Sequence, residues 1–319
     1  MYLGIDLGGT NIAAALVDGG GTIQSRTSIP TDSSGGADSV IKGLMDVSET
    51  LIGGAASAPL SIGIGVPGTV DDEAGAVVFT PNLPLRKVNI TRALRERFGC
   101  PVRLGNDANC AALGELVAGG AKGAQDVVLI TLGTGIGGGL IIGGRLITGV
   151  SGGGCELGHQ VIVAGGRKCG CGRLGCWESY ASATGLVRTA ADYLETRHDS
   201  LIWALCGGDM KKIGAKSVFD AFRAGDHAAK LIVGEYIGHL CTGLINLINM
   251  LEPELICVGG GVSYAWDCIA EPVQKIIDAE KYYRFSPEAP HTRIVRAELG
   301  NDAGIIGAAM LGAQLTVDS

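Results

Sequence analysis

Four residues between positions 159 and 176 have the side chains and spacing of a closed metal site. They supply one imidazole and three thiols, from His159, Cys169, Cys171 and Cys176. Such a set fills all four positions around a tetrahedral zinc ion and leaves none for substrate or water, so the predicted zinc is structural. Two acids flank the set, Glu156 and Glu178, and could turn toward a polyhydroxylated ligand. The alternatives are a zinc knuckle with incidental acids, or cysteines that only fill a core.

Two glycine-rich turns follow apolar segments, and their backbone amides could face phosphate oxygens. The first is Gly8-Gly9-Thr10-Asn11, preceded by Asp6, and the second is Gly133-Thr134-Gly135. Asp6 is placed to hold Mg²⁺ through the water shell of the ion. An ordinary hairpin with a capping Asp is the alternative for the first turn alone, but the second turn favours a nucleotide gripped from both sides. A third segment, Gly259-Gly260-Gly261, suits close packing of an adenine or ribose, although alone it is a weak signal.

The run 133–138 also satisfies G-x-G-x-x-G, a pattern of dinucleotide-binding proteins. That fold requires a helix after the glycines, whereas residues 139–146 are apolar and Gly-punctuated and continue a hairpin. We therefore reject a dinucleotide site.

Asp107 is the candidate general base. It follows Gly105 and Asn106 where a predicted strand gives way to a predicted helix. In phosphoryl transfer to an alcohol, one carboxylate accepts the hydroxyl proton while the enzyme positions the reactants. A helix N-terminus favours the ionised form of Asp107, and Asn106 could hold a neighbouring hydroxyl. The alternative is that Asp107 only caps the helix, as we expect for Asp302 in a similar context.

The composition limits the partners. The 319 residues include 25 Lys+Arg and 32 Asp+Glu, a net charge of −7, and no long basic run occurs, which argues against nucleic acid. The N-terminus lacks a charged n-region and no uncharged apolar segment of about 18 residues is present, so neither export nor membrane spanning is predicted. The cysteines outside the metal set are scattered singly in apolar contexts, which indicates reduced core residues. We expect a cytoplasmic protein.

The chain repeats itself in three places, which indicates two similar halves. Residues 3–10 resemble 128–135, residues 61–66 resemble 255–260, and Leu-Gly-Asn-Asp-Ala at 104–108 recurs at 299–303. The echoes lie further apart in the later part, which indicates an insertion over about residues 149–220 that contains the cysteine set.

Each half is predicted to form a mixed sheet flanked by helices, an α/β fold. The expected strands are 2–7, 12–17, 22–29, 61–66, 101–104, 127–132, 136–142, 145–147, 254–258 and 292–298. The expected helices are 37–53, 89–98, 107–118, 181–196, 217–224, 227–250, 265–280 and 302–315. We expect a smaller domain of residues 1–118 plus 300–319, a larger domain of residues 119–299, and a ligand cleft between them.

Six motifs occur in the order of the ROK (repressor, open reading frame, kinase) family, and within it the chain resembles the bacterial glucokinases most. They are Asp6-x-Gly8-Gly9-Thr10, Val66-Pro67-Gly68, Pro81-Asn82-Leu83, Gly105-Asn106-Asp107, Glu156-x-Gly158-His159 and Cys169-x-Cys171-Gly172-x-x-Gly175-Cys176-x-Glu178. The resemblance implies a duplicated actin-like (ribonuclease H-like) ATPase fold, ATP with Mg²⁺ as phosphoryl donor, a hexose acceptor and a homodimer or homotetramer.

Carried over by position, the resemblance implies that Asp107 is the general base on the sugar 6-hydroxyl. It implies a sugar site made of Gly68, Asn82, Asn106, Asp107, Glu156, His159 and Glu178, and zinc ligation by His159, Cys169, Cys171 and Cys176. His159 then has two tasks, because one ring nitrogen can ligate zinc while the other donates to a sugar hydroxyl. Asn11 stands where many family members carry Lys or Thr, so the sequence leaves open whether a positive charge faces the phosphates at this position.

Two other classes of protein compete with a kinase. A sugar-responsive regulator of the same family would need a DNA-binding segment, and here the first predicted strand begins at residue 2. A non-catalytic sugar-binding protein would lack the base or a phosphate turn, and both are present. Among kinases, glucose is favoured as acceptor by the resemblance; N-acetylmannosamine, fructose, mannose and allose stay open, because discrimination between them depends on geometry.

Overall fold

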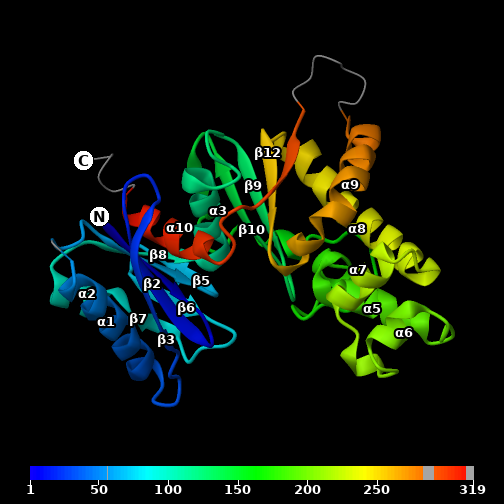
Figure 1. The fold of residues 1–319 in the computed structure, drawn as a ribbon. Helices are drawn as coiled ribbons and strands as arrows, with labels where there is room; N and C mark the ends of the chain where they lie inside the picture. Colours follow the sequence, from blue (N-terminus) through cyan, green and yellow to red (C-terminus); the bar gives the residue numbers. More distant parts are fainter. Residues whose placement is uncertain (56, 283–290, 314–319) are drawn as a thin grey trace. The chain divides into compact units, whose positions relative to one another are not determined.

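The computed structural model describes residues 1–55, 57–282 and 291–313 and divides the chain into two compact units (Figure 1). Unit 1 comprises Met1–Leu129, Gly139–Cys155 and Ala297–Ser319, and unit 2 comprises Ile130–Gly138 and Glu156–Arg296. The domain boundaries expected after residues 118 and 299 stay a prediction. Residues 314 and 315 of the last expected helix lie outside the described residues.

Unit 1 is built on a five-stranded mixed sheet in the order β3-β2-β1-β4-β8. The strands are β1 (Tyr2–Leu7), β2 (Asn11–Val17), β3 (Ile23–Pro30), β4 (Ile62–Val66) and β8 (Val102–Asn106). β1 pairs antiparallel with β2 and parallel with β4, which in turn pairs parallel with β8. Side chains of a strand alternate between the faces of the sheet, so Leu3, Ile5 and Leu7 share one face, where they pack with α1 (Ala37–Gly53).

α1 presents a stripe of buried residues at helical spacing toward that face, with Val40, Leu44, Val47 and Leu51 among them. The same core includes residues of α2 (Thr91–Phe98) and of a three-stranded sheet that the sequence did not predict. That sheet has the order β5-β6-β7, with β5 at Thr69–Asp71, β6 at Ala76–Phe79 and β7 at Arg86–Asn89. It carries Gly68, Thr80 and Asn82 at its ends.

The opposite face of the first sheet is covered by α3 (Asp107–Ala118) and α10 (Asp302–Ala313). Glycines on the sheet and on α10 allow a very close approach. A Cβ atom added at Gly63 would lie 1.7 Å from the carbonyl oxygen of Ala308, and one at Gly307 would lie 1.6 Å from that of Cys110. These glycines therefore serve helix packing rather than a ligand.

A second five-stranded sheet has the order β11-β10-β9-β12-β13. Its strands are β9 (Val127–Leu132), β10 (Ile136–Ile142), β11 (Arg145–Ile147), β12 (Leu255–Gly259) and β13 (Arg293–Arg296). The order repeats that of the first sheet, with β9 in the place of β1, β12 in the place of β4, and β13 in the place of β8. Two of the sequence echoes fall on equivalent strands, β1 with β9 and β4 with β12, and the third leads into α3 in one half and α10 in the other, so the predicted duplication is confirmed. β10 is a strand, as the rejection of a dinucleotide site required.

Unit 2 holds the remaining helices: α4 (Glu178–Ala181), α5 (Ala183–Leu194), α6 (Leu201–Leu205), α7 (Ala215–Arg223), α8 (His227–Leu251) and α9 (Trp266–Glu280). Short 3-10 turns lie at Leu157–His159, Met210–Lys212 and Gly261–Ala265. By length and mean hydropathy α8 is the one helix among the described residues that could cross a membrane, but 56% of the apolar window is buried inside the protein. A core helix has the same composition, and α8 packs against α4, α5, α7 and α9.

Candidate active site and metal centre

The first glycine turn joins β1 to β2 and is held from both sides. The Gly8 amide donates to the Asn11 carbonyl over 2.9 Å, which closes the turn. Thr31 clamps it further, because its hydroxyl donates to the Gly8 carbonyl over 2.7 Å and its amide donates to the Thr10 carbonyl over 2.8 Å. A Cβ atom added at Gly9 would lie 3.7 Å from Cβ of Asn82, so the predicted sugar ligand Asn82 lies beside the predicted phosphate turn.

Asp6 and Asp107 form an acidic pair in unit 1. Burial, and then the negative charge of Asp107, raise the pKa of Asp6 from 3.8 to about 6. The carboxylate also faces the first turn of α10, since a Cβ atom added at Gly304 would lie 3.4 Å from Oδ2 of Asp6. A buried carboxylate beside a second acidic residue offers oxygen donors of the kind that a hard divalent cation prefers, so Asp6 fits Mg²⁺.

Asn106, not Asp107, is the N-cap of α3. Its Oδ1 accepts from the amides of Ala108 (2.9 Å) and Asn109 (3.2 Å), and its Nδ2 donates to the Gly68 carbonyl over 3.2 Å. Asp107 occupies the first helical position, where its Oδ1 accepts from the Ala108 amide over 2.9 Å. The alternative that Asp107 is the helix cap is therefore wrong. Adjacent Asn and Asp residues are equally good caps, so sequence alone could not choose between them.

Asp302, the counterpart of Asp107, has a different partner. Its carboxylate forms a two-point contact with the guanidinium of Arg26 on β3, with distances of 3.1 and 3.0 Å. This ion pair ties the start of α10 to the edge of the sheet, and the capping role that the sequence suggested for Asp302 stays a prediction.

The four predicted zinc ligands converge in unit 2. Their ligand atoms all lie within 4.8 Å of one another. Sγ of Cys171 is 3.7 Å from Sγ of Cys176, and Sγ of Cys169 is 3.7 Å from Nδ1 of His159. Tetrahedral zinc with Zn–S bonds of about 2.3 Å places neighbouring sulfurs roughly 3.8 Å apart, so the cluster fits that ion. Nδ1 of His159 faces the cluster, which leaves Nε2 as the nitrogen for another partner.

The segment that carries the four ligands, residues 159–176, is here called the knuckle. Two isolated β-bridges shape its backbone, one between Val161 and Cys176 and one between Lys168 and Leu174. Gly175 has a φ of 81° and packs so tightly that an added Cβ atom would lie 1.7 Å from the Val163 carbonyl. The Arg173 amide lowers the pKa of the Cys171 thiol, while burial raises that of Cys176 to about 12. Without a metal the cluster therefore has thiols of unequal acidity, and the exposed Cys171 is the readier thiolate.

The two acids that flank the knuckle lie in different settings. Glu156 is exposed and precedes the 3-10 turn Leu157–His159, whose His159 amide donates to the Glu156 carbonyl over 3.0 Å. Glu178 begins α4, and its Oε2 accepts from the Ile136 amide over 3.0 Å. The next-door Trp177 is fully buried and donates from Nε1 to the His239 carbonyl on α8 over 3.0 Å. This contact anchors the helix start that carries Glu178.

The second glycine turn lies beside the third glycine segment. Residues 133–135 join β9 to β10, with the Gly133 amide donating to the Gly135 carbonyl over 3.0 Å. Gly260 has a φ of 82°, and a Cβ atom there would lie 2.6 Å from the backbone of Leu132, the residue before the turn. The predicted nucleotide-binding residues of unit 2 thus lie close together. They are Gly133, Thr134, Gly135, Gly259, Gly260 and Gly261.

Each unit therefore assembles its own share of the predicted site. Unit 1 holds Asp6, the turn 8–11, Gly68, Asn82, Asn106 and Asp107; unit 2 holds the glycine segments, Glu156, His159, Glu178 and the cysteines. Sequence reasoning missed Thr80, which is buried and donates from its hydroxyl to the Leu83 carbonyl over 2.7 Å, shaping the loop that carries Asn82. A Thr before Pro-Asn gives no signal of that role.

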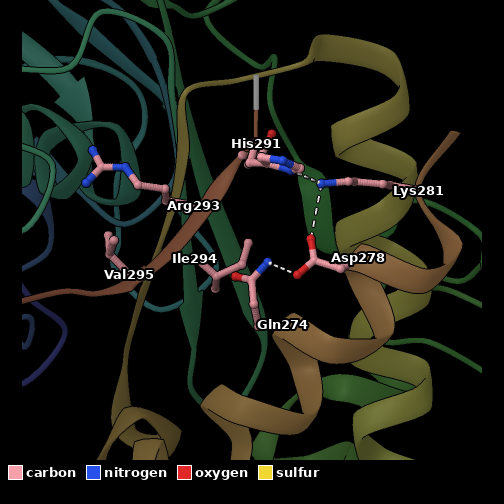
Figure 2. A pocket seen from close by; sticks show the side chains of 8 residues that line it. Gln274, Asp278, Lys281, His291, Arg293, Ile294 and Val295 are labelled. Carbon is pink, nitrogen blue, oxygen red and sulfur yellow. Dashed lines mark hydrogen bonds and ion pairs between the residues drawn. The ribbon is translucent and has the colours of Figure 1, made fainter. Parts of the chain in front are cut away.

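One pocket of unit 2 lies apart from these residues. It has a volume of about 550 Å³ and lies between α9 and β13. In Figure 2, Lys281 points between Asp278 and His291, with its Nζ 3.1 Å from Asp278 Oδ1 and 2.6 Å from His291 Nδ1, while Arg293 points away. The described residues that line it include none of the predicted site residues, so its size alone does not mark it as the active site.

Comparison with known proteins identifies the family. The family model described as "ROK family" matches residues 2–314. The chain belongs to the ROK family.

A glucokinase of Thermotoga maritima is 38% identical to this ROK protein over 313 residues, which cover 97% of this chain and 96% of the relative. The crystal structure of a ROK glucokinase from Streptomyces griseus in complex with glucose and AMPPNP matches it with a TM-score of 0.77 at 36% identity, covering 98% and 99% of the two chains. A putative xylose repressor of Caldicellulosiruptor is more distant, at 28% identity over 96% of this chain and 76% of the relative. The duplicated sheets agree with the actin-like ATPase fold of this ROK protein.

Proposed function

We propose that this ROK protein is a phosphotransferase that transfers the γ-phosphoryl group of ATP to the 6-hydroxyl of glucose. The observation that carries the proposal is the acidic pair of unit 1, Asp6 with Asp107, placed beside the glycine turn 8–11. Full-length similarity to glucokinases at 36–38% identity supports glucose and ATP as the substrates.

Asp107 is the proposed general base. Its carboxylate accepts the proton of the sugar hydroxyl as that oxygen bonds to phosphorus, and its place at the N-terminus of α3 favours a negative charge there. Because Asn106 caps the helix, replacing the carboxylate of Asp107 leaves the cap of α3 in place. The sugar hydroxyls are proposed to bind Gly68, Asn82 and Asn106 from unit 1 and Glu156, His159 and Glu178 from unit 2.

The nucleotide phosphates are proposed to face the amides of the turns 8–11 and 133–135, with the segment 259–261 beside the adenosine. Asp6 would hold Mg²⁺ through water, and this ion neutralises charge on the phosphates when it is bound. Zinc in the cluster of His159 and the three cysteines would fix the histidine ring, so that Nε2 can donate to a sugar hydroxyl.

The test is a coupled ADP-release assay with Mg·ATP against glucose, N-acetylmannosamine, fructose, mannose and allose. We expect the highest kcat/KM for glucose. Asp107→Asn should lose turnover by about 10²–10⁴-fold with sugar affinity retained, because only the proton acceptor is removed. Asp302→Asn is the matched control and should turn over like the wild type.

Other outcomes separate the alternatives. Preference for another hexose would keep the mechanism and change the acceptor. Sugar binding without turnover on any sugar would favour a regulator, the class of the more distant repressor relatives. Cytoplasmic location and assembly as a homodimer or homotetramer, without nucleic-acid or membrane partners, stay predictions.

A further inference from the structure

Glu178 touches both the metal cluster and the second glycine turn. Its Oε2 accepts from the Ile136 amide over 3.0 Å, and its Oε1 lies 3.6 Å from Sγ of Cys169. A Cβ atom added at Gly135 would lie 2.1 Å from Oε2, so the carboxylate lies directly against the turn. One side chain therefore bridges a predicted zinc ligand and a predicted phosphate-binding loop.

The metal cluster sets the position of this side chain through the start of α4. Cys176 lies two residues before Glu178, and its carbonyl accepts from the Ser179 amide over 3.0 Å. The Trp177 amide donates to the Gln160 carbonyl over 2.8 Å, which ties the same segment to the residue after His159. A metal bound to His159 and Cys176 would thus fix the segment that carries Glu178 and the segment to which it is hydrogen-bonded.

Glu178 contacts the residue after the turn 133–135, and the start of α5, close to Glu178 in the chain, contacts the first residue of the turn. The Ala183 amide, at the start of α5, donates to the Gly133 carbonyl over 2.8 Å. Gly158 packs beneath the strand that follows the turn, since an added Cβ atom would lie 2.3 Å from the Ile136 carbonyl. Residues between the 3-10 turn Leu157–His159 and the start of α5 therefore support both ends of the turn 133–135.

We propose that Glu178 is a positioning residue for the turn 133–135, and that occupancy of the cluster by metal thereby raises the affinity for nucleotide. This inference rests on the proposed function, because it takes the turn as part of the nucleotide site. It gives Glu178 a task on the donor side in addition to the sugar contact proposed above.

The experiment measures the Kd of Mg·AMPPNP by titration calorimetry in the absence of sugar, so that a sugar contact cannot contribute. Glu178→Ala should raise the Kd about tenfold, because the Ile136 amide loses a charged acceptor. Glu178→Gln should stay within about threefold of wild type, since its amide oxygen can still accept from Ile136. Zinc content and thermal unfolding verify that each variant is loaded and folded.

A double-mutant cycle tests the route of the coupling. Cys171→Ser, at an exposed ligand, should lose zinc and raise the nucleotide Kd in the wild-type background, but add little in the Glu178→Ala background. Cys100→Ser, outside the cluster, should keep the wild-type Kd. An unchanged Kd in Glu178→Ala, or equal effects of Cys171→Ser in both backgrounds, would overturn the inference. Failure of the loaded wild type to bind Mg·AMPPNP would overturn the proposed function together with it.

Discussion

At the scale of single residues, the buried carboxyl group of Asp6 lowers the stability of the fold at a position where a carboxylate is proposed to be needed for function. It is largely removed from water and faces the negative charge of Asp107, and both effects raise its pKa to about 6. An ionised Asp6 is therefore unfavourable in the metal-free protein. A bound cation would reverse that preference, so the proposed Mg²⁺ residue weakens the fold while no ion is bound.

Asp6→Asn should stabilise the metal-free protein at neutral pH. The folded-state pKa of about 6 exceeds the ordinary value of 3.8, so the contribution of Asp6 to the free energy of unfolding is fully present below about pH 4 and is lost as the pH rises through 6. The difference between the two values corresponds to an upper bound of roughly 3 kcal/mol. Urea unfolding without added Mg²⁺ should show the Asn variant more stable by about 1–3 kcal/mol at pH 7.5, and nearly equal to wild type at pH 4.

Asp107→Asn serves as a comparison, because it removes the second cause of the shift and leaves the first. It should stabilise the protein at pH 7.5 by less than Asp6→Asn does. A stability difference between Asp6→Asn and wild type that is the same at both pH values would contradict the assignment of the raised pKa to Asp6.

At the scale of elements, glycines determine how α3 and α10 pack on the first sheet. Gly4 pairs with Gly63 across β1 and β4, and Gly65 pairs with Gly105 across β4 and β8, so one face of the sheet is almost free of side chains there. Gly307 gives α10 the same freedom toward α3. The helices that carry Asp107 and Gly304 toward Asp6 are thus placed by residues that lack a side chain.

Gly307→Ala should destabilise the protein by about 3 kcal/mol or more. A methyl group would lie 1.6 Å from the Cys110 carbonyl oxygen, which is backbone and cannot move aside without displacing α3. Gly234→Ala is the matched control, because Gly234 is exposed on α8 with nothing within 4 Å of an added Cβ atom, and alanine favours helix. It should stabilise by up to ~1 kcal/mol. Equal effects of the two variants in chemical denaturation would contradict the packing role.

At the scale of the whole molecule, the sequence predicts the duplication because repeated strands and turns keep their residues. The echo at 104–108 and 299–303 falls on a strand-to-helix region of each half, and the strand orders of the two sheets agree. The metal cluster is equally predictable, since its ligand types and spacing are local. The sheet of β5, β6 and β7 is not, because strands of three or four residues among Asp, Gly and Pro give no periodic pattern.

Contacts between distant parts of the chain also escape prediction. Glu178 and Ile136 are 42 residues apart, and no pattern marks a backbone amide as a partner for a carboxylate. The sequence therefore predicts a set of candidate site residues but not which of them support one another. The support found here is local to unit 2, where the knuckle contacts the start of α4 and the turn 133–135.

Loss of the proposed zinc should therefore loosen a defined part of the molecule rather than all of it. The ligands and the contacts that radiate from them lie in unit 2, whereas the core of α1 with β1 and β2 contains none of them. Hydrogen exchange followed by mass spectrometry should show faster exchange in Cys171→Ser across residues 157–183 and 133–138, with the amides of β1, β2 and α1 unchanged. Cys100→Ser, a cysteine of unit 1 outside the cluster, should leave residues 157–183 protected. Uniformly faster exchange in Cys171→Ser would instead mean that the metal supports the whole chain as one cooperative unit.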